Sequence, residues 1–512
     1  MGTKRVSGRH GGPTLERVQT DRAFFGHPKA IGTLGFMQLC WNFGRFGMSS
    51  LLIYYLYGSA PDGLGLSRTD ASQLVSLYYA ASVVCGIVGS IVADRILGPR
   101  RALLASRVIE TAGYAALAIP ALGVGGYAAS QVLLCSAAMV AGRSSEALAG
   151  KLYARRDDRR DRAFNVIYII QNIGCVSPLL VGMLAQSAGY GVGFGACALV
   201  SAAGALSLAL TDRRFFGPVG LLPDDPMPRA RRRPFVAALA LGALAVVVLG
   251  AALLASGSVS VAALAEAVSV TTVVVPIAYL AVILRSPKTT REECRRVMGW
   301  IPLFVCNCLT FLVWMQGTTT LSVYAEQVID RNLWGFEPTP TAFQTLPGLL
   351  AIAWGAAVGS LWRRLGGRSP GVTRKFGVGT VIWGAGALYM CLPLLLFGTQ
   401  GHGFVAPGWL VGFYVVIILG EAITFSSGWA LSSAIAPVAF STQMVTVWGL
   451  SQSTGSALNA LAVRLYQPGS EVAYFAVLGT VVVAAGAVLV ALAPRLARLM
   501  ALEARKAGRE GE

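Results

Sequence analysis

The feature that most constrains this chain is a series of apolar stretches, each about 20 residues long. A helix of that length crosses the ~30 Å hydrocarbon core of a bilayer, and about fourteen such stretches can be placed. They run near residues 31–57, 71–93, 102–122, 126–149, 163–187, 191–211, 234–256, 258–284, 299–325, 340–362, 376–398, 407–434, 440–465 and 470–494. Inside hydrocarbon every backbone N–H and C=O needs an internal hydrogen bond, which a helix provides. With 55% apolar and only 13% charged residues, the sequence predicts an all-α integral membrane protein.

The positive charges are distributed unevenly, although the net charge of +18 could by itself suggest nucleic-acid binding. When the N-terminus is taken as cytoplasmic, nearly all Lys and Arg residues fall on the inner side. The exceptions are Arg68, Arg331 and Arg464 in outer loops and Arg45, Arg107 and Arg143 inside spans. Cytoplasmic loops of membrane proteins carry this excess of basic residues. The pattern predicts a bacterial inner-membrane protein with both termini in the cytoplasm, and it argues against nucleic acid as a partner.

A polar, proline-containing segment interrupts the apolar pattern after the sixth predicted span. The next two spans consist mostly of Ala, Val and Leu, which offer a solute little polar lining and so indicate a lipid-facing or structural role. Six further spans follow, a plan that suits a transporter of two six-helix bundles with an inserted pair. The predicted parts are a cytoplasmic basic tail (1–30), an N-terminal six-helix bundle (31–211), a cytoplasmic linker (212–233), an inserted helix pair (234–284), a second cytoplasmic linker (285–298), a C-terminal six-helix bundle (299–494) and a cytoplasmic tail (495–512).

Residues that hold cofactors or perform catalysis are sparse. Cys306-x-Cys308 lies in an apolar span without the further His or Cys ligands that a zinc site requires. The three His residues, His10, His27 and His402, lie outside mid-membrane positions, and no G-x-x-x-x-G-K-[ST] nucleotide motif occurs. The sequence therefore predicts no enzyme, no metal and no cofactor, and it argues against ATP hydrolysis as a driving force.

Motifs in both halves of the chain share their order and spacing with one transporter family. In the first half they are His27-Pro28-Lys29, Gly47-Met48, Tyr78, Gly89-x-x-x-Ala93-Asp94-Arg95-x-x-Gly98-x-x-Arg101, Leu152-Tyr153, Asp157 to Phe164, and Tyr168 with Asn172-Ile173-Gly174. In the second half they are Gln316 with Leu321, Gln344 with Pro347, and Glu421 followed by Gly428 and Ala436-Pro437. The chain thus resembles the proton-dependent oligopeptide transporter family of the major facilitator superfamily, as a divergent prokaryotic member. The resemblance implies proton-driven peptide uptake, with the solute bound between two six-helix bundles.

The first span departs from the family pattern E-x-x-E-R-F-x-Y-Y-G. This chain reads Gln38-Leu39-Cys40-Trp41-Asn42-Phe43-Gly44-Arg45-Phe46-Gly47 there, so both carboxylates and the motif arginine are replaced. The Lys-Pro-Asn of the fourth family helix aligns with Gly142-Arg143-Ser144, and the acid that often precedes Gln316 in the family is Met315 here. The residues that the family uses for proton coupling and for holding a peptide carboxylate are therefore largely absent.

An ionisable side chain at mid-bilayer costs ~2.5–3.5 kcal/mol to insert, so each one needs a partner or a function. Glu421 stands where the family has a Glu that faces the amine end of its ligand; a buried, neutral acid is the alternative. The resemblance also places Asn172 and Tyr78 at lining positions, although either can instead form hydrogen bonds across helices. Gln316 and Trp448 are further candidates for a cavity lining, with helix packing as the alternative.

Basic residues inside the spans are candidates for a positive pole of the site. Arg143 lies next to the missing family Lys, and Arg45 lies on the first span close to the altered motif. Glu146 is three residues after Arg143 on the same helix face, so the two can form a coupling pair or a merely local salt bridge. Arg107 and Glu110 repeat this spacing near the cytoplasmic end of the third span, where snorkelling explains the arginine.

The loop after the second span contains Asp94, Arg95 and Arg101 and resembles the cytoplasmic gating loop of the superfamily. In such a loop, an Asp against a helix N-terminus and Arg residues against carboxylates hold one access state closed. A charge cluster at the membrane boundary, without a gating role, is the alternative.

The leading prediction is secondary active transport of a small peptide or an amine-bearing, peptide-like solute by alternating access. If protons are coupled, Glu146 or Glu421 carries them, because Gln38, Trp41 and Asn42 cannot titrate near neutral pH. Export of a drug-like or secondary metabolite and a non-transporting membrane sensor are the alternatives. The expected partners are the solute and the lipid bilayer, and the expected form is a monomer.

Overall fold

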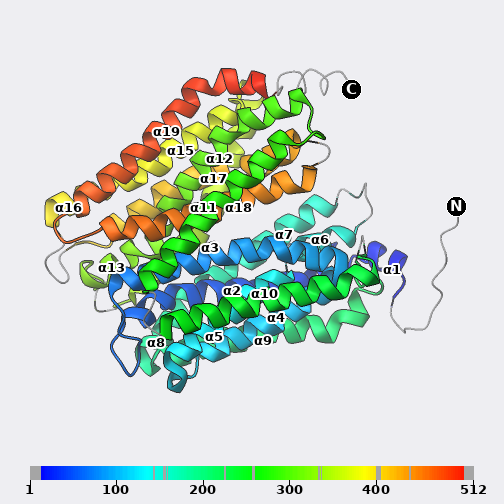
Figure 1. The fold of residues 1–512 in the computed structure, drawn as a ribbon, viewed down its shortest axis with the longest axis horizontal. Coiled ribbons are helices and arrows are strands. Elements are labelled where there is room, and N and C mark those ends of the chain that lie inside the picture. The colour runs from blue at the N-terminus through cyan, green and yellow to red at the C-terminus, as the bar shows by residue number, and fades with distance from the viewer. Residues whose placement is uncertain are drawn as a thin grey trace. The chain divides into compact units, whose positions relative to one another are not determined.

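Figure 1 shows the computed structural model of the chain. It describes residues 13–141, 144–153, 157, 159–223, 226–255, 260–332, 335, 337–398, 405–437 and 440–500. In these residues the regular secondary structure is helical, joined by turns, loops and two isolated β-bridges. The prediction of an all-α protein is confirmed.

The chain forms two units, and several long helices contribute to both of them. Unit 1 comprises Met1–Met48, Cys85–Ser177 and Gly191–Val247, and unit 2 comprises Ser49–Val84, Pro178–Tyr190 and Val248–Glu512. The first helices are α1 (Leu15–Thr20), α2 (Lys29–Tyr57), α3 (Arg68–Val92), α4 (Pro99–Leu117), α5 (Gly123–Ala141), α6 (Ser144–Lys151), α7 (Arg159–Ile173), α8 (Ser177–Ala188), α9 (Tyr190–Phe215) and α10 (Arg229–Ala255). The remaining ones are α11 (Val261–Arg285), α12 (Arg291–Thr318), α13 (Thr320–Gln327), α14 (Leu346–Leu365), α15 (Val372–Tyr389), α16 (Cys391–Phe397), α17 (Gly408–Ile435), α18 (Ser441–Ala462) and α19 (Glu471–Leu499).

Local sequence explains where several helices begin. Thr290 and Glu293 form a reciprocal capping box at the start of α12, in which each side chain accepts a backbone N–H of the other residue. Helix α4 begins with Pro99, whose fixed φ suits the first helical position. Gly98 precedes it with a φ of +80°, and a Cβ there would lie 2.8 Å from the carbonyl oxygen of Leu221. This turn therefore requires glycine for both its backbone conformation and its packing.

Nine helical segments in the described part of the chain are long and apolar enough to cross a membrane. Several predicted spans are not continuous helices, and two of the breaks lie well inside the span. The span predicted at 299–325 is divided into α12 and α13 at Thr319, whose φ of −120° and ψ of −95° are not helical. The span predicted at 163–187 contains a short 3₁₀ turn at Gly174–Val176 between α7 and α8. Apolar patterning cannot reveal such breaks, because side chains rather than hydropathy satisfy the freed backbone groups.

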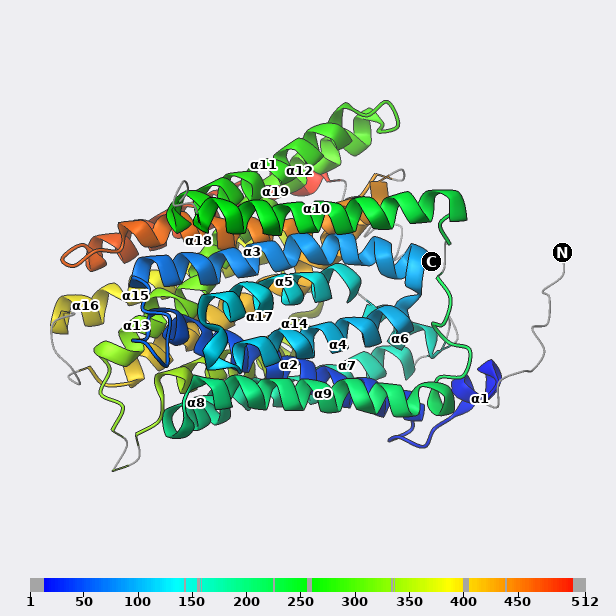
Figure 2. The ribbon, with the colours of Figure 1, turned by 60° about the horizontal axis from the view of Figure 1, so that its bottom comes forward.

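Helices α15 and α19 in unit 2 lie side by side along a stripe of glycines (Figure 1). A Cβ added at Gly384 would lie 2.6 Å from the backbone nitrogen of Val483, and one at Gly486 would lie 2.7 Å from that of Val381. Small residues at such positions let two membrane helices approach closely and gain van der Waals contact. In unit 1, α4 and α5 form a similar neighbouring pair (Figure 2).

Helix α11 of the predicted inserted pair packs on α18 within unit 2. The Thr454 hydroxyl donates to the carbonyl oxygen of Thr272 (3.2 Å), and Arg464 forms an ion pair with Glu266 (3.2 Å). Glu266 is therefore paired, as a structural role for this helix requires. The buried residues of α11 include the hydroxylated Ser269 and Thr272 and the apolar Leu280 and Ile283, which suits helix packing in a membrane better than a solute pathway.

Candidate functional site

Glu421 lies in the middle of α17, a helix made almost entirely of apolar and small residues. Its side chain is half-buried, and no described residue forms an ion pair or hydrogen bond with its carboxylate. The nearby Thr424 hydroxyl donates instead to the backbone carbonyl oxygens of Gly420 (3.1 Å) and Glu421 (3.4 Å). An ionised carboxylate without a partner is costly inside a membrane. Glu421 therefore requires either a proton or a cationic ligand.

Gln316 lies near the end of α12 in a closed network of hydrogen bonds. Its Nε2 donates to Asn459 Oδ1 on α18 (2.6 Å), and its Oε1 accepts from the Tyr474 hydroxyl on α19 (3.0 Å). Asn459 Nδ2 donates to Ser76 Oγ (2.9 Å) and to Thr319 Oγ1 (3.3 Å). Gln316 and Asn459 are fully buried, and the predicted lining role of Gln316 stays a prediction. In this conformation Gln316 joins three helices of unit 2.

Further hydrogen bonds surround α13. The Tyr54 hydroxyl donates to the carbonyl oxygen of Ser322 (2.9 Å), and Gln344 Nε2 donates to the Ser322 hydroxyl (2.8 Å). The Tyr57 hydroxyl donates to Glu326 Oε2. Sequence reasoning missed Glu326, because it lies at the end of its predicted span, where a carboxylate carries no unusual cost. These contacts tie the C-terminal end of α2 to α13.

Tyr78 on α3 begins a row of aromatic rings in unit 2. Its ring centroid is 5.5 Å from that of Tyr79, which is 5.6 Å from Trp314, and Trp314 stacks on Phe311 at 5.4 Å. Tyr78 is only partly buried. Aromatic faces of this kind attract cations and stack on flat groups. The lining role of Tyr78 stays a prediction.

Trp448 belongs to a packed core. It is 2% exposed, and its ring lies 5.6 Å from those of Trp300 and Phe376. A Cβ at Gly428 would collide with the Trp448 ring. The rotation of α18 points this ring into the interior of unit 2, as the packing alternative expects, and a lining role for Trp448 stays a prediction.

In unit 1, side chains of α2 and α4 form a charged and aromatic group, which we call the α2–α4 cluster: Trp41, Arg45, Arg107, Glu110 and Tyr114. Arg107 Nη1 forms an ion pair with Glu110 Oε2 (2.5 Å), and the Tyr114 hydroxyl donates to Glu110 Oε1 (3.0 Å). Arg107 is 6% exposed, so the prediction that it snorkels toward water is wrong. The ion pair and the aromatic ring beside it lower the free-energy cost of burying the Arg107 guanidinium.

The α2–α4 cluster carries a net positive charge. The guanidinium carbons of Arg107 and Arg45 lie 5.1 Å and 5.5 Å from the centroid of the same Trp41 ring. Glu110 neutralises one guanidinium, whereas Arg45 forms no ion pair with any described residue and is half-buried. A cation–π contact stabilises a desolvated guanidinium by about 2 kcal/mol without cancelling its charge. The cluster can therefore accept one more anionic group.

Asn172 lies on α7 where this helix approaches α2. Its Nδ2 donates to the carbonyl oxygen of Tyr168 on its own helix (2.8 Å), while Asn42 Nδ2 donates to the carbonyl oxygen of Gln171 (2.9 Å). A Cβ at Gly174 would lie 2.5 Å from the carbonyl oxygen of Leu39. In this conformation Asn172 is buried and bonds within its own helix rather than across helices, and its lining role stays a prediction.

Of the predicted coupling pair Arg143 and Glu146, the structure describes only Glu146. Arg143 lies outside the described residues. Glu146 lies on α6 and is exposed, and its side chain has a polar contact of its own. The Arg143–Glu146 pair therefore stays a prediction.

The predicted gating residues Asp94, Arg95 and Arg101 are exposed in unit 1. Their neighbour Arg100 is buried. Arg100 Nε lies 2.5 Å from Asp212 Oδ1, and Nη1 donates to the carbonyl oxygens of Gly217 (2.8 Å) and Val219 (3.1 Å). A further contact is the bond from Met227 N to the carbonyl oxygen of Arg95 (2.9 Å). This loop fastens the linker that follows α9 to the start of α4.

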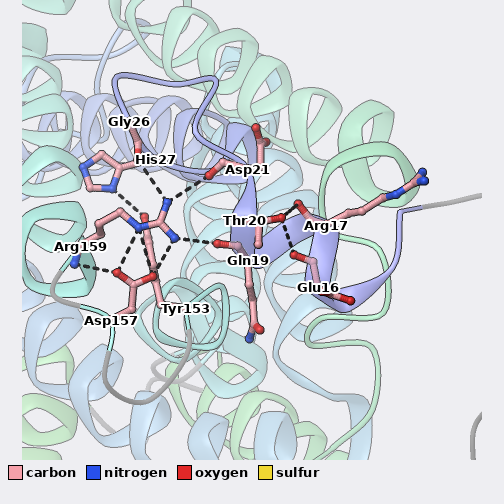
Figure 3. Close-up of polar contacts among 10 residues, drawn as sticks. All are labelled: Glu16, Arg17, Gln19, Thr20, Asp21, Gly26, His27, Tyr153, Asp157 and Arg159. Atoms are coloured by element: carbon pink, nitrogen blue, oxygen red, sulfur yellow. Dashed lines mark hydrogen bonds and ion pairs between the residues drawn. The ribbon is translucent and has the colours of Figure 1, made fainter.

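Arg159 fastens the N-terminal segment in a similar way (Figure 3). Its guanidinium pairs with Asp157 (2.7 Å) and donates to the carbonyl oxygens of Gln19 (2.7 Å), Asp21 (3.3 Å) and Gly26 (3.3 Å). These bonds with Arg159 hold the pKa of Asp157 below its ordinary value. One side chain thus binds three backbone carbonyls of the segment that precedes α2.

His27 completes this contact, with its Nδ1 2.8 Å from the Tyr153 hydroxyl. Burial, followed by the charges of Arg159 and Arg162, lowers the pKa of His27, against an opposing effect of Asp157. The docked segment therefore binds a proton at His27 less readily than the undocked one, so the contribution of neutral His27 to docking is fully present above about pH 6.5 and is lost as pH falls below it.

We expect amide hydrogen exchange across residues 14–30 to accelerate below about pH 6.5, after correction for the intrinsic pH dependence of exchange. The variant His27→Gln keeps a polar side chain but cannot titrate, and its corrected exchange should not change with pH. Equal pH dependence in the two proteins would show that another group controls the docking.

Comparison with known proteins agrees with the resemblance seen in the sequence. Residues 100–481 match the model of the POT family. The Di-/tripeptide transporter of Lactococcus lactis subsp. cremoris is 32% identical over 94% of this chain and 98% of its own length.

Two solved structures are also similar to this chain. A mutant form of the peptide transporter POT, solved in complex with alafosfalin, is 33% identical, with a TM-score of 0.89 over 96% of this chain and 100% of that one. A POT family transporter in complex with 5-aminolevulinic acid is 28% identical, with a TM-score of 0.88 over 94% of this chain and 100% of that one. Sequence and fold agree along nearly the whole length, and the chain belongs to the POT family.

Proposed function

We propose that the chain is a secondary transporter that carries a small peptide or a peptide-like, amine-bearing solute across the membrane by alternating access. The family membership supports transport, and the relatives named above include a di-/tripeptide transporter and transporters solved with alafosfalin and with 5-aminolevulinic acid. The bacterial inner membrane, with both termini in the cytoplasm, is the location that the charge distribution supports.

The observation that carries this proposal is the carboxylate of Glu421 in the apolar helix α17, for which the described residues provide no ion pair. A solute ammonium group would supply the missing charge, and charge-assisted hydrogen bonds of this kind contribute about 1.5–3 kcal/mol. Binding of the solute would therefore remove the free-energy cost of this carboxylate in the membrane and add a favourable contact.

Within unit 1, the α2–α4 cluster is suited to bind a carboxylate group. Arg45 and Arg107 flank Trp41, and among the described residues only Glu110 balances them. Arginine binds carboxylates through paired N–H groups. The cluster would thus replace the cations that the altered motifs lack, with Arg143 as a further contributor.

Proton coupling in this protein does not use the first span, where Gln38, Trp41 and Asn42 cannot titrate near neutral pH. We assign any coupled proton to Glu421 or Glu146. Glu421 has the better environment, because a half-buried carboxylate without a partner gains most from protonation when no cation is bound.

Counterflow in proteoliposomes tests the function directly. Vesicles loaded with unlabelled dipeptide should accumulate labelled dipeptide transiently, because a carrier exchanges solute without net flow. C-amidated peptides should be weaker substrates if the α2–α4 cluster binds the carboxylate. A ligand that binds the purified protein without any counterflow would identify a sensor, and counterflow only of cationic metabolites would favour the exporter alternative.

A further inference from the structure

A cavity of about 440 Å³ lies where the first turns of α12 meet the last turns of α19. Four arginines and one carboxylate line it, together with the side chain of Leu499. The charged residues are Glu292, Arg295 and Arg296 of α12 and Arg495 and Arg498 of α19. A cavity of this composition is suited to an anion.

The walls of this arginine cavity are set by tight helix packing. A Cβ added at Gly299 would lie 3.0 Å from Met500 Cγ and 3.1 Å from Leu499 Cβ, so α12 and α19 touch directly beside the cavity. Leu496 and Met500 are buried at this contact. Because the two backbones are fixed against each other, the arginines are held at neighbouring positions despite their flexible side chains.

Within the part of the chain that the structure describes, the positive charge of the cavity is mostly uncompensated. Glu292 forms only a long ion pair with Arg296 (3.6 Å). Arg295, Arg495 and Arg498 form no ion pair with any described residue, and Arg498 Nε reaches only the carbonyl oxygen of Pro494 on its own helix (3.4 Å). Like charges this close repel one another, and the N-terminus of α12 adds a partial positive charge. A bound anion would relieve both effects.

The position of the cavity identifies where such an anion comes from. Helices α12 and α19 belong to two of the segments that are long and apolar enough to cross the membrane, and the cavity lies at their ends. The basic residues at these ends place them on the cytoplasmic side. At this depth the bilayer presents phosphate groups of its inner leaflet, and basic pockets between helices bind such headgroups.

We propose that the arginine cavity binds the phosphate of an anionic phospholipid from the cytoplasmic leaflet. The arginines of α12 and α19 donate paired N–H groups to the phosphate oxygens. The exposed apolar surfaces of α12 and α19 on the membrane side of the arginines contact the acyl chains. The lipid joins the ends of the two helices and stabilises unit 2. A free phosphate ion shares the recognition chemistry but lacks the acyl chains.

The test uses the full chain in nanodiscs of phosphatidylcholine, with and without phosphatidylglycerol. Phosphatidylglycerol should raise the Tm of the unmodified protein. The triple variant Arg295→Gln/Arg495→Gln/Arg498→Gln should lose most of this rise and bind the anionic lipid roughly a hundredfold more weakly, at about a factor of five for each arginine. The matched control Arg213→Gln/Arg214→Gln/Arg229→Gln removes the same charge from exposed positions of unit 1 and should keep the full rise.

Two further measurements separate the alternatives. Inorganic phosphate added to the detergent-solubilised protein should leave the Tm nearly unchanged; a rise equal to that with lipid would overturn the lipid assignment in favour of a soluble anion. If the triple variant does not fold, Arg495→Lys/Arg498→Lys keeps the charge but loses the paired donors and should lose part of the rise. Equal effects of phosphatidylglycerol on the cavity variant and the matched control would overturn the proposal.

Discussion

Replacing Glu421 by Gln should weaken the binding of an amine-bearing solute roughly ten- to hundredfold, while the protein folds as before. The substitution keeps the size of the side chain and removes its charge, and a charge-assisted hydrogen bond contributes about 1.5–3 kcal/mol. No described residue loses an ion pair, because none pairs with this carboxylate. The Tm should therefore stay the same or rise slightly, since an unpaired charge no longer has to be buried.

Calorimetric titration of a dipeptide into the purified protein measures this effect. Glu266→Gln is the matched control, because it makes the same chemical change at a half-exposed ion pair on α11, and it should leave the affinity unchanged. An N-acetylated dipeptide should bind the unmodified protein as poorly as the free dipeptide binds Glu421→Gln. Unchanged affinity in Glu421→Gln would remove this residue from the site.

The second large effect is expected in the α2–α4 cluster. Glu110→Gln leaves Arg107 and Arg45 as two cations beside one indole ring, and Arg107→Gln leaves the carboxylate of Glu110 without its partner. Breaking a buried ion pair in this way destabilises a protein by about 3–5 kcal/mol. Each single variant should therefore lower the Tm strongly, and the double variant should be less destabilised than the two losses added together.

A double-mutant cycle of thermal unfolding in detergent measures the coupling between Arg107 and Glu110. Thr111→Ala is a suitable control, because it removes a hydroxyl contact to Ser201 (2.9 Å) from the same helix without changing any charge. It should cost about 1 kcal/mol. Strictly additive losses for Arg107 and Glu110 would mean that the ion pair contributes no stability of its own.

The sequence was informative about properties that depend on one helix at a time. Span length, the excess of basic residues on one side and the three-residue spacing of Arg107 and Glu110 are all local, and the structure confirms the helices and this ion pair. The burial of Arg107 was not predictable, because it depends on Trp41 of another helix. The same holds for Gln316, whose partner Asn459 is 143 residues further along the chain.

The rotation of a helix about its axis limits what the sequence alone can predict about the direction of a side chain. Successive residues of an α-helix point about 100° apart, so a motif that marks Arg101 says little about whether Arg100 faces the protein or the solvent. In the structure Arg100 forms the ion pair with Asp212, and Arg101 is exposed. Trp448 illustrates the same difficulty, since a tryptophan in a transporter span can face a cavity or the packed interior, and only the neighbours Trp300 and Phe376 decide between them.

The glycine stripe between α15 and α19 has a mechanical consequence. Two backbones that touch at Gly384 and Gly486 leave no layer of side chains that could slide or repack, and such a contact is stiff compared with an ordinary helix interface. During a transport cycle this helix pair should therefore move as one rigid body, and any bending has to occur at more flexible positions of unit 2. The interruption at Thr319, where the backbone leaves helical geometry, is the point at which α12 and α13 can hinge.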